Sequence, residues 1–272
     1  MGFNLAPRYD PLAVFSQSKT PVGLYARKRW LQERSTTWEQ DFRKTVASLV
    51  AGQGRDGSWN GSIVKSVRCL FWLHLTVREP NKAIGRCLDW LVEKSRRVFT
   101  KRHGSLGEPI TNRLLKGLPF TEGCGAFFLS GATLFLATIF GRQKDPRILS
   151  VYKRLEELGK AGQGRWCGWS CSNNIFRAFV VHPEYTEADS VALAVRAFGN
   201  AQERSGRWRR PVPFYQTINA LAHLNSKEAD AQLEKAFEWL FKTQNRDGTW
   251  GRSDREWKTF LVVHAMKNKG VL

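Results

Sequence analysis

The sequence predicts an all-α fold in which five to six helix pairs close into a ring, with the inner helices lining a cavity. Two observations lead to this prediction. A short Gln–Trp segment recurs at intervals of roughly 40–50 residues, the length of one helix pair in a repeat array. Each copy also lies between a helix with one apolar stripe and a helix that is apolar on most sides. A helix that is apolar all round must be buried all round, and closing the row of pairs into a ring buries it.

In the recurring segment a glutamine precedes a tryptophan by six residues, and a glycine stands shortly before the tryptophan. The copies are QGRDGSW (53–59), QGRWCGW (163–169), QERSGRW (202–208) and QNRDGTW (244–250). A degenerate copy fits at 100–106 (TKRHGSL), with Gly104 at the glycine offset. We expect each glutamine to tie a helix end and each tryptophan to pack in the loop, which is a structural role.

The outer helices are predicted from a helical stripe of apolar residues ahead of each copy. Before Gln244 the stripe consists of Leu233, Ala236, Phe237, Leu240 and Phe241, which is the spacing of one helix face. Helix starts are marked by a capping box at Thr36 and Glu39 and by the pair Asp145-Pro146. We expect outer helices near 36–53, 82–99, 145–161, 187–202 and 227–244.

The inner helices follow the copies and are expected near 61–78, 121–140, 172–180, 211–224 and 255–268. The segment 125–141 carries no charge and has about 16 apolar or small residues, fewer than the roughly 20 that span a bilayer, so it is a core helix. All inner helices would begin at the same mouth of the ring, where their dipoles favour anions. Residues 1–35 are expected to be an irregular lead-in to a single ring domain over 36–272, with a sixth pair left open.

The Gln…Gly-x-Trp repeats between alternating outer and inner helices resemble the QW motifs of the squalene–hopene cyclase and protein prenyltransferase superfamily. The resemblance covers residues 36–268. It implies an α/α toroid and an enzyme that acts on an apolar isoprenoid-like substrate, of terpene cyclase or prenyltransferase type. Likeness of fold does not by itself assign an activity.

The superfamily's class II cyclases carry an Asp-x-Asp-Asp string whose middle aspartate protonates an alkene, and this sequence has no such string. The nearest match, residues 186–189 (TEAD), has alanine in place of the acid. The catalytic candidates are therefore polar residues expected near the mouth of the ring, namely Glu122, Tyr215, Asp254 and Glu256. One of the three carboxyl groups would serve as acid or base if burial raised its pKa.

The superfamily's protein prenyltransferases hold zinc with an Asp-x-Cys pair and a distant histidine, and Glu122-Gly123-Cys124 has the spacing of that pair. Cys167 and Cys171 flank the start of the next inner helix, so three cysteines are expected near one end of the ring. Zinc accepts thiolate ligands, and Cys124, Cys167 and Cys171 are the candidate ligands. The cofactor stays undetermined, because buried thiols in a reducing cytosol are the alternative interpretation.

Aromatic side chains and arginines complete the candidate site. Aromatic faces stabilise cations, as a carbocation reaction requires, and arginine suits phosphate oxygens. The substrate-binding candidates are Phe127, Phe128, Phe176, Phe214, Trp257, Arg209, Arg210 and Arg252. The arginines precede inner helices and would bind a substrate diphosphate at the mouth.

The net charge of +19 at pH 7 is spread along the whole chain. Such a charge attracts anionic membranes and nucleic acids, but no nucleic-acid-binding motif is present, which disfavours that partner. We expect a cytoplasmic protein, with peripheral contact to an anionic membrane left open. Two hypotheses compete: an enzyme acting on an isoprenoid-like substrate, and a catalytically silent toroid that binds a lipid or a protein partner.

Overall fold

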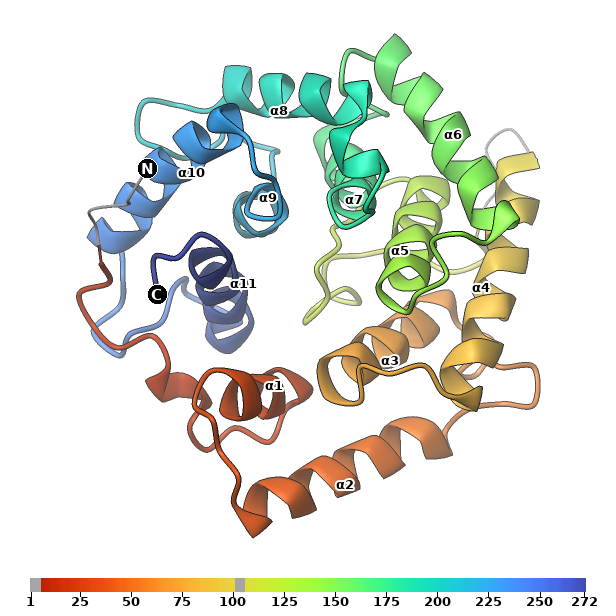
Figure 1. Cartoon of the computed structure of the whole chain (residues 1–272), viewed down its shortest axis with the longest axis horizontal. Coiled ribbons are helices and arrows are strands. Elements are labelled where there is room, and N and C mark those ends of the chain that lie inside the picture. The colour runs from red at the N-terminus through yellow and green to blue at the C-terminus, as the bar shows by residue number, and fades with distance from the viewer. Residues whose placement is uncertain (1–5, 101–105) are drawn as a thin grey trace.

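Helices alternate between an outer and an inner ring around a common axis (Figure 1). A computed structural model of the chain describes residues 6–100 and 106–272. The outer helices are α2 (Thr36–Ala51), α4 (Lys82–Thr100), α6 (Pro146–Ala161), α8 (Asp189–Ala201) and α10 (Lys227–Lys242). The inner helices are α1 (Pro21–Arg29), α3 (Ile63–Thr76), α5 (Gly125–Ile139), α7 (Trp169–Phe179), α9 (Phe214–Leu221) and α11 (Arg255–Asn268). The predicted all-α toroid is confirmed, and none of the described residues forms a β-strand.

The ring closes where the inner helix α1 packs against both α3 and α11. Residues 1–35 were expected to be irregular, and α1 corrects that expectation. Thr20 caps the helix by accepting a hydrogen bond from the Gly23 amide at 3.0 Å, and Pro21 occupies its first turn. Both are ordinary helix-start signals. The periodicity of apolar residues does not predict this helix, because its last turn consists of the basic residues Arg27, Lys28 and Arg29.

The inner helices pack closely because they carry small residues where they cross. A Cβ atom on Gly131 of α5 would lie 2.5 Å from the Asn174 carbonyl oxygen of α7, a distance that no side chain tolerates. Within the described residues, none of the helices is long and apolar enough to cross a membrane. The apolar face of α5 is instead buried against α3, α4 and α7.

The glutamines of the first, third and fourth full copies link their turns to another segment of the ring, whereas Gln163 donates to the Lys160 carbonyl of its own outer helix. Gln53 donates to the Gly57 carbonyl at 2.9 Å and to the Ala83 carbonyl of α4 at 2.7 Å. Gln202 repeats this pattern with the Gln232 carbonyl of α10 at 2.8 Å. Gln244 instead exchanges two hydrogen bonds with the backbone of Tyr9. The N-terminal segment therefore takes the place that a sixth outer helix would occupy.

The tryptophans of the repeated turns are buried and donate to the end of the preceding outer helix. The indole nitrogens of Trp59, Trp208 and Trp250 donate to the carbonyls of Leu49, Phe198 and Leu240 at 2.7, 3.0 and 2.8 Å. Each indole thereby supplies a donor to a carbonyl in the last turns of an outer helix, where carbonyls lack intrahelical partners. These tryptophans therefore hold each turn against its outer helix, which is the structural role that the sequence predicts.

The third turn departs from its predicted register. Trp166, not Trp169, donates to the outer helix, with its indole nitrogen 2.7 Å from the Leu155 carbonyl of α6. The preceding Gly164 has φ +82°, and a Cβ atom there would lie 2.3 Å from the Ala194 amide nitrogen of α8. Gly57 and Gly206 occupy the same position in their turns. The structural unit is therefore Gly-x-Trp at 164–166, whereas Trp169 begins α7. The degenerate copy at 100–106 falls largely outside the described residues.

One mouth of the ring, where the inner helices begin, is crossed by part of the stretch 106–124 that precedes α5, and this stretch runs inside the ring in Figure 1. Glu108 accepts a hydrogen bond from the Val64 amide at the start of α3, at 2.9 Å. Lys116 forms an ion pair with Asp254 at the start of α11, at 2.5 Å. Phe120 is buried against Phe128, with ring centroids 5.9 Å apart. The mouth that was expected to receive an anionic ligand is therefore covered.

Candidate functional site

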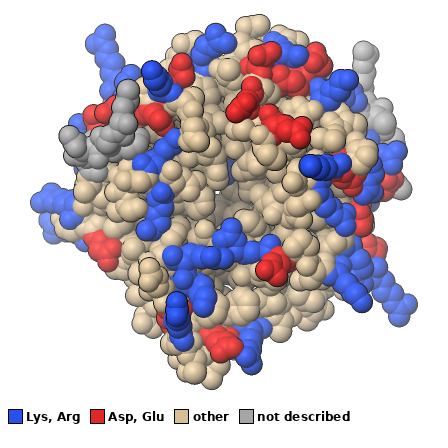
Figure 2. Space-filling view, in the orientation of Figure 1, with Lys and Arg blue, Asp and Glu red and all other residues tan. Residues whose placement is uncertain are grey.

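The inner helices enclose a cavity of about 370 Å³ on the ring axis, here called the lumen. Its wall combines aromatic rings with a cluster of basic groups. The lining residues that matter below are Tyr25, Phe71, His74, Arg78, Phe135, Arg177, Asn219, His223, Trp257, Phe260 and His264. The space-filling view shows a hollow at the centre of one face, with Lys and Arg side chains beside it (Figure 2).

Helical spacing places the lumen residues on the inward face of their helices. Phe71 and His74 lie three residues apart on α3, and Arg78 follows the end of that helix. Trp257, Phe260 and His264 show the same spacing on α11. Residues three and four apart share one helix face. The basic residues stand at the carboxyl ends of the inner helices, opposite the covered mouth.

Arg177 of α7 is the most deeply buried charged group in the lumen wall, with only 2% of its surface exposed. Its Nη1 donates to Asn219 Oδ1 at 2.8 Å and its Nη2 donates to the Gln216 carbonyl at 2.9 Å. Among the residues that the structure describes, its Nε has no hydrogen-bond partner. Burial lowers the pKa of Arg177 to about 9, so the guanidinium still carries its charge at neutral pH.

Three histidines line the same end of the lumen. Burial lowers the pKa of His74 and of His223 to about 3, and that of His264 to about 4. The nearby charges of Arg78 and Arg177 are smaller causes in the same direction. All three imidazoles are therefore neutral at neutral pH. They can donate or accept hydrogen bonds and would gain protons if an anion entered.

The described lining residues include no Asp or Glu. Arg177 accordingly donates hydrogen bonds to neutral groups but has no carboxylate partner in the lumen wall, although a buried charge is normally paired with an opposite charge. Arg78 at the opening lies over the ring of Tyr25, 5.7 Å from its centroid. The lumen thus presents cationic and neutral basic groups beside aromatic walls, which is the environment for an apolar molecule with an anionic group.

Of the aromatic residues predicted to bind substrate, Trp257 lines the lumen. Phe128 and Phe176 are fully buried, and Phe176 packs against Phe198 of the outer helix α8. Phe214 packs against Trp239 of the outer helix α10. Phe127 is half-buried on the first turn of α5. These four rings do not line the lumen, because they fill the space between helices instead.

The predicted catalytic carboxylates also lie outside the lumen. Glu122 is exposed and accepts a hydrogen bond from the Asn112 amide at 2.9 Å. Asp254 and Glu256 line a groove of about 630 Å³ at the covered mouth, and Trp257 lines both that groove and the lumen. Glu256 accepts hydrogen bonds from the hydroxyl groups of Ser18 and Thr20. These carboxylates therefore act at the outer surface, where they pair with neighbouring cations, hydroxyl groups and backbone amides.

Tyr215, the fourth catalytic candidate, is half-buried near Lys258, whose Nζ lies 5.5 Å from the ring centroid. Burial raises the pKa of its hydroxyl group. The predicted diphosphate-binding residues Arg209, Arg210 and Arg252 are exposed and do not line the lumen. The cationic groups that do line it are Arg78 and Arg177.

The structure brings together the three cysteines that the sequence singles out. The sulfur atoms of Cys124, Cys167 and Cys171 lie within 4.8 Å of one another. Cys124 and Cys167 are exposed, and burial raises the pKa of the Cys171 thiol to about 12. Glu122 is not part of this group, and none of the three cysteines lines the lumen.

Sequence reasoning missed Arg177, Arg78 and His223. A signal was present, because a charged residue inside an otherwise apolar inner helix must face a cavity or a partner. The segment Ile175 to Val181 (IFRAFVV) carries Arg177 as its one charge. A search for polar residues on inner helices would have found it.

Comparisons of the fold identify similar structures. A protein from Actinoplanes is 18% identical with a TM-score of 0.57, and the match covers 92% of this chain and 89% of that one. A variant of the type II terpene cyclase MstE from Scytonema, in complex with geranylgeranyl dihydroxybenzoate, is 13% identical with a TM-score of 0.59. The match covers 97% of this chain and 88% of that one. The apo form of MstE is 13% identical with a TM-score of 0.56, and the match covers 97% of this chain and 88% of that one. No family model and no curated protein matches the sequence. At these identities the likeness shows that the chain has a terpene cyclase-like fold.

Proposed function

We propose that the lumen binds an apolar isoprenoid-type molecule that carries an anionic group, and that the anionic group lies between Arg177, Arg78 and the histidines. The observation that carries the proposal is the buried Arg177 guanidinium, which has no acidic partner among the described lining residues. A carboxylate or phosphate would supply the missing counter-charge with charge-assisted hydrogen bonds.

The aromatic wall supports an isoprenoid as the apolar part. Phe71 contacts Trp257 edge-to-face with centroids 5.8 Å apart, and Trp257 stacks on Phe260 at 5.6 Å. A cavity of about 370 Å³ lined by aromatic rings and a few convergent polar groups is typical of small-molecule sites. The similar fold of MstE, whose solved complex contains a geranylgeranyl compound, supports the same chemical class.

The geometry favours binding over cyclisation started by a carboxylic acid. Protonating an alkene requires a strong acid close to it, and the carboxylates Glu122, Asp254 and Glu256 lie outside the lumen. The lumen histidines are neutral at neutral pH, and a neutral imidazole is too weak an acid to protonate an alkene. The toroid is therefore proposed as an isoprenoid-binding protein, with an enzyme of cyclase or prenyltransferase type as the competing function.

An isoprenoid lipid resides in membranes, so contact with an anionic bilayer belongs to the same proposal. The net charge of +19 favours attraction to such a surface. The attraction would weaken with salt, because exposed charges more than a Debye length apart are screened.

The test compares geranylgeranyl diphosphate with geranylgeraniol, which has the same chain and no anionic group. We expect the diphosphate to bind and quench Trp fluorescence, and the alcohol to bind at least about tenfold more weakly. That difference is about 1.4 kcal/mol, within the range for a hydrogen bond to a charged group. Equal affinity would contradict the proposed anion site. Conversion of either compound to a cyclised or transferred product, detected by mass spectrometry, would instead establish the enzyme.

A further inference from the structure

Two separate stretches of the chain meet at the cysteine cluster. Cys124 is the residue immediately before α5, Cys167 lies in the turn before α7, and Cys171 is in the first turn of α7. All three are free thiols. The Sγ atoms of Cys124 and Cys167 lie 3.7 Å apart, which is too far for a disulfide bond of about 2.05 Å.

The spacing of the sulfur atoms matches metal coordination. A tetrahedral site with zinc–sulfur bonds of about 2.3 Å holds two sulfur atoms about 3.8 Å apart. The separation of 3.7 Å between Cys124 and Cys167 agrees with this value. Cys171 Sγ lies within 4.8 Å of both, so a small inward rotation of its side chain completes the three-sulfur set.

The backbone around the cluster is fixed by buried contacts. The Cys124 amide donates to Cys171 Sγ at 3.2 Å. A Cβ atom at Gly123 would lie 2.9 Å from the same sulfur, so glycine is needed there for the approach. Thr121 and Asn174 exchange two hydrogen bonds of 2.9 Å, which clamp the stretch before α5 onto α7.

The helix dipoles at the cluster oppose the effect of burial, which raises the pKa of the Cys171 thiol. The cluster lies at the N-termini of α5 and α7, and neither helix has a side-chain hydrogen bond at its cap. The dipoles of both helices therefore stabilise negative charge at this point. Arg165 lies beside the cluster and donates to the Cys167 carbonyl at 3.2 Å.

We propose that Cys124, Cys167 and Cys171 bind one soft divalent metal ion of the zinc class through three thiolate ligands. The exposure of Cys124 and Cys167 leaves the fourth coordination position open to solvent. Each thiol releases its proton when the metal binds. Because the cysteines do not line the lumen, the ion acts as a clamp between α5, α7 and the turn that precedes α7. This proposal is independent of the isoprenoid site.

The experiment is titration of the reduced, metal-free chain with Co²⁺, followed by Zn²⁺ competition. We expect the thiolate-to-cobalt absorption of a tetrahedral site to saturate at one ion per chain and to disappear when Zn²⁺ is added. Cys124→Ser and Cys167→Ser should each weaken Co²⁺ binding by more than about 100-fold, since losing a supporting group alone costs about 10–100-fold. Both positions are exposed, so the variants should fold. Cys69→Ala, in the buried core of α3, is the control and should bind as the wild type does.

Zinc should also raise the melting temperature of the wild type and leave that of Cys124→Ser unchanged, because a ligand stabilises only a state that binds it. Absence of the cobalt spectrum in the reduced wild type would overturn the proposal. Equal binding by Cys124→Ser and wild type would also overturn it. Either failure would leave the measurements on geranylgeranyl diphosphate unaffected.

Discussion

Arg177 Nη1 donates to Asn219 Oδ1 at 2.8 Å, which joins the inner helices α7 and α9 across the wall of the lumen. Asn219 Nδ2 in turn donates to the Leu261 carbonyl of α11 at 3.1 Å. Three successive inner helices thus share one buried polar chain. The asparagine fixes one edge of the guanidinium, and Nε has no partner within the described part of the chain. In the function proposed above, this Nε is the atom available to the anionic group of the bound molecule.

Replacing Arg177 with methionine should remove the preference for an anionic ligand. The apolar substitution keeps the volume near that of the arginine stem and deletes the buried charge. We expect affinity for geranylgeranyl diphosphate to fall roughly 10–100-fold, corresponding to about 1.5–3 kcal/mol for hydrogen bonds to a charged group. Affinity for geranylgeraniol should change little. Binding would be measured by titration of Trp fluorescence.

Arg209→Met is the matched control, because Arg209 is exposed and does not line the lumen. It should bind both compounds as the wild type does. If Arg209→Met weakened diphosphate binding and Arg177→Met did not, the anion site would lie at the mouth that the sequence predicts. Circular dichroism and thermal unfolding would establish that both variants fold.

The free energy of unfolding should already decrease between about pH 6.5 and pH 4, above the pH range in which carboxylates take up protons. The folded-state pKa values of His74, His223 and His264 are about 3 to 4, below the unfolded value of about 6.5. The unfolded chain therefore binds more protons between these values. The free energy of unfolding is greatest above about pH 6.5 and falls as the pH decreases toward 4. Urea unfolding at pH 7.5, 6 and 5 would measure this slope.

His223→Asn should flatten that slope, since it removes one of the titrating groups while keeping a polar side chain. A slope identical to that of the wild type would show that His223 does not contribute. Geranylgeranyl diphosphate should bind more tightly at pH 5.5 than at pH 8, because an anion raises the pKa of adjacent imidazoles and binding then takes up protons.

Trp166 should contribute more to stability than Trp169, contrary to the repeat as it reads in the sequence. Trp166 is buried and its indole nitrogen donates to the Leu155 carbonyl at 2.7 Å. Trp166→Ala should cost about 3–5 kcal/mol, as large aromatic truncations in a core do. Trp169→Ala should cost clearly less, because Trp169 is half-buried. Equal losses in urea unfolding would contradict the corrected register.

Patterns with a local physical cause were predicted well. The outer and inner helices follow from the 3.6-residue period and the recurring turns, and the structure moves most of their ends by only a few residues. The third turn was misread because Gly168-Trp169 imitates the motif locally. The structural choice of Trp166 depends on the neighbouring helix α8, which lies against Gly164. The seven residues 163–169 by themselves contain no information about that contact with α8.

The site was predicted less well because its position depends on contacts between distant segments. The sequence predicts that the inner helices begin at one mouth, but the segment carrying Glu108, Lys116 and Phe120 covers it. The basic groups of the lumen stand at the other end. The cysteines were placed together correctly because two consecutive inner helices must begin near the same point of the ring.

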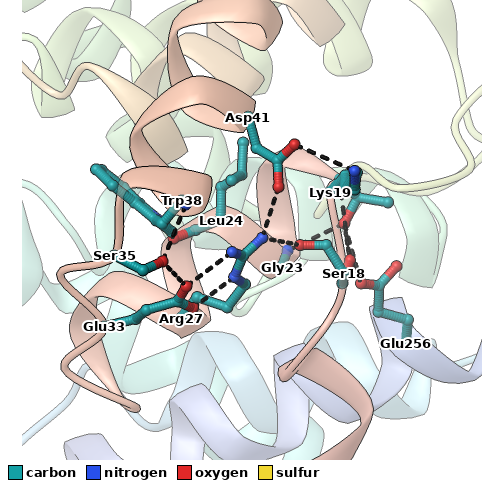
Figure 3. A network of polar contacts seen from close by, with 11 residues as sticks. Ser18, Lys19, Gly23, Leu24, Arg27, Glu33, Ser35, Trp38, Asp41 and Glu256 are labelled. Carbon is teal, nitrogen blue, oxygen red and sulfur yellow. Dashed lines mark hydrogen bonds and ion pairs between the residues drawn. The ribbon is translucent and has the colours of Figure 1, made fainter.

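Arg27 of α1 should contribute strongly to holding α1 against α2 and the connection between them. Figure 3 shows its guanidinium between Glu33 and Asp41. Its Nε and Nη2 donate to the Glu33 carboxylate at 2.7 and 2.9 Å, and Nη1 donates to Asp41 at 3.1 Å. Arg27 is 3% exposed. Hydrogen bonding to Arg27 lowers the pKa of Glu33 to about 2, so the pair is intact at neutral pH.

Arg27→Met should reduce the free energy of unfolding by about 3–5 kcal/mol, the usual cost of removing one partner of a buried ion pair. The exposed pair of Arg43 and Glu39 is the control, and Arg43→Met should cost less than about 1 kcal/mol. The Glu33 contribution is present above about pH 4.5 and is lost as the pH falls toward 2, since its folded pKa is depressed. Arg27→Met should therefore lose less stability than the wild type between pH 4.5 and 2.5. Parallel acid unfolding curves for the two proteins would show that this network does not stabilise the packing of α1 on α2.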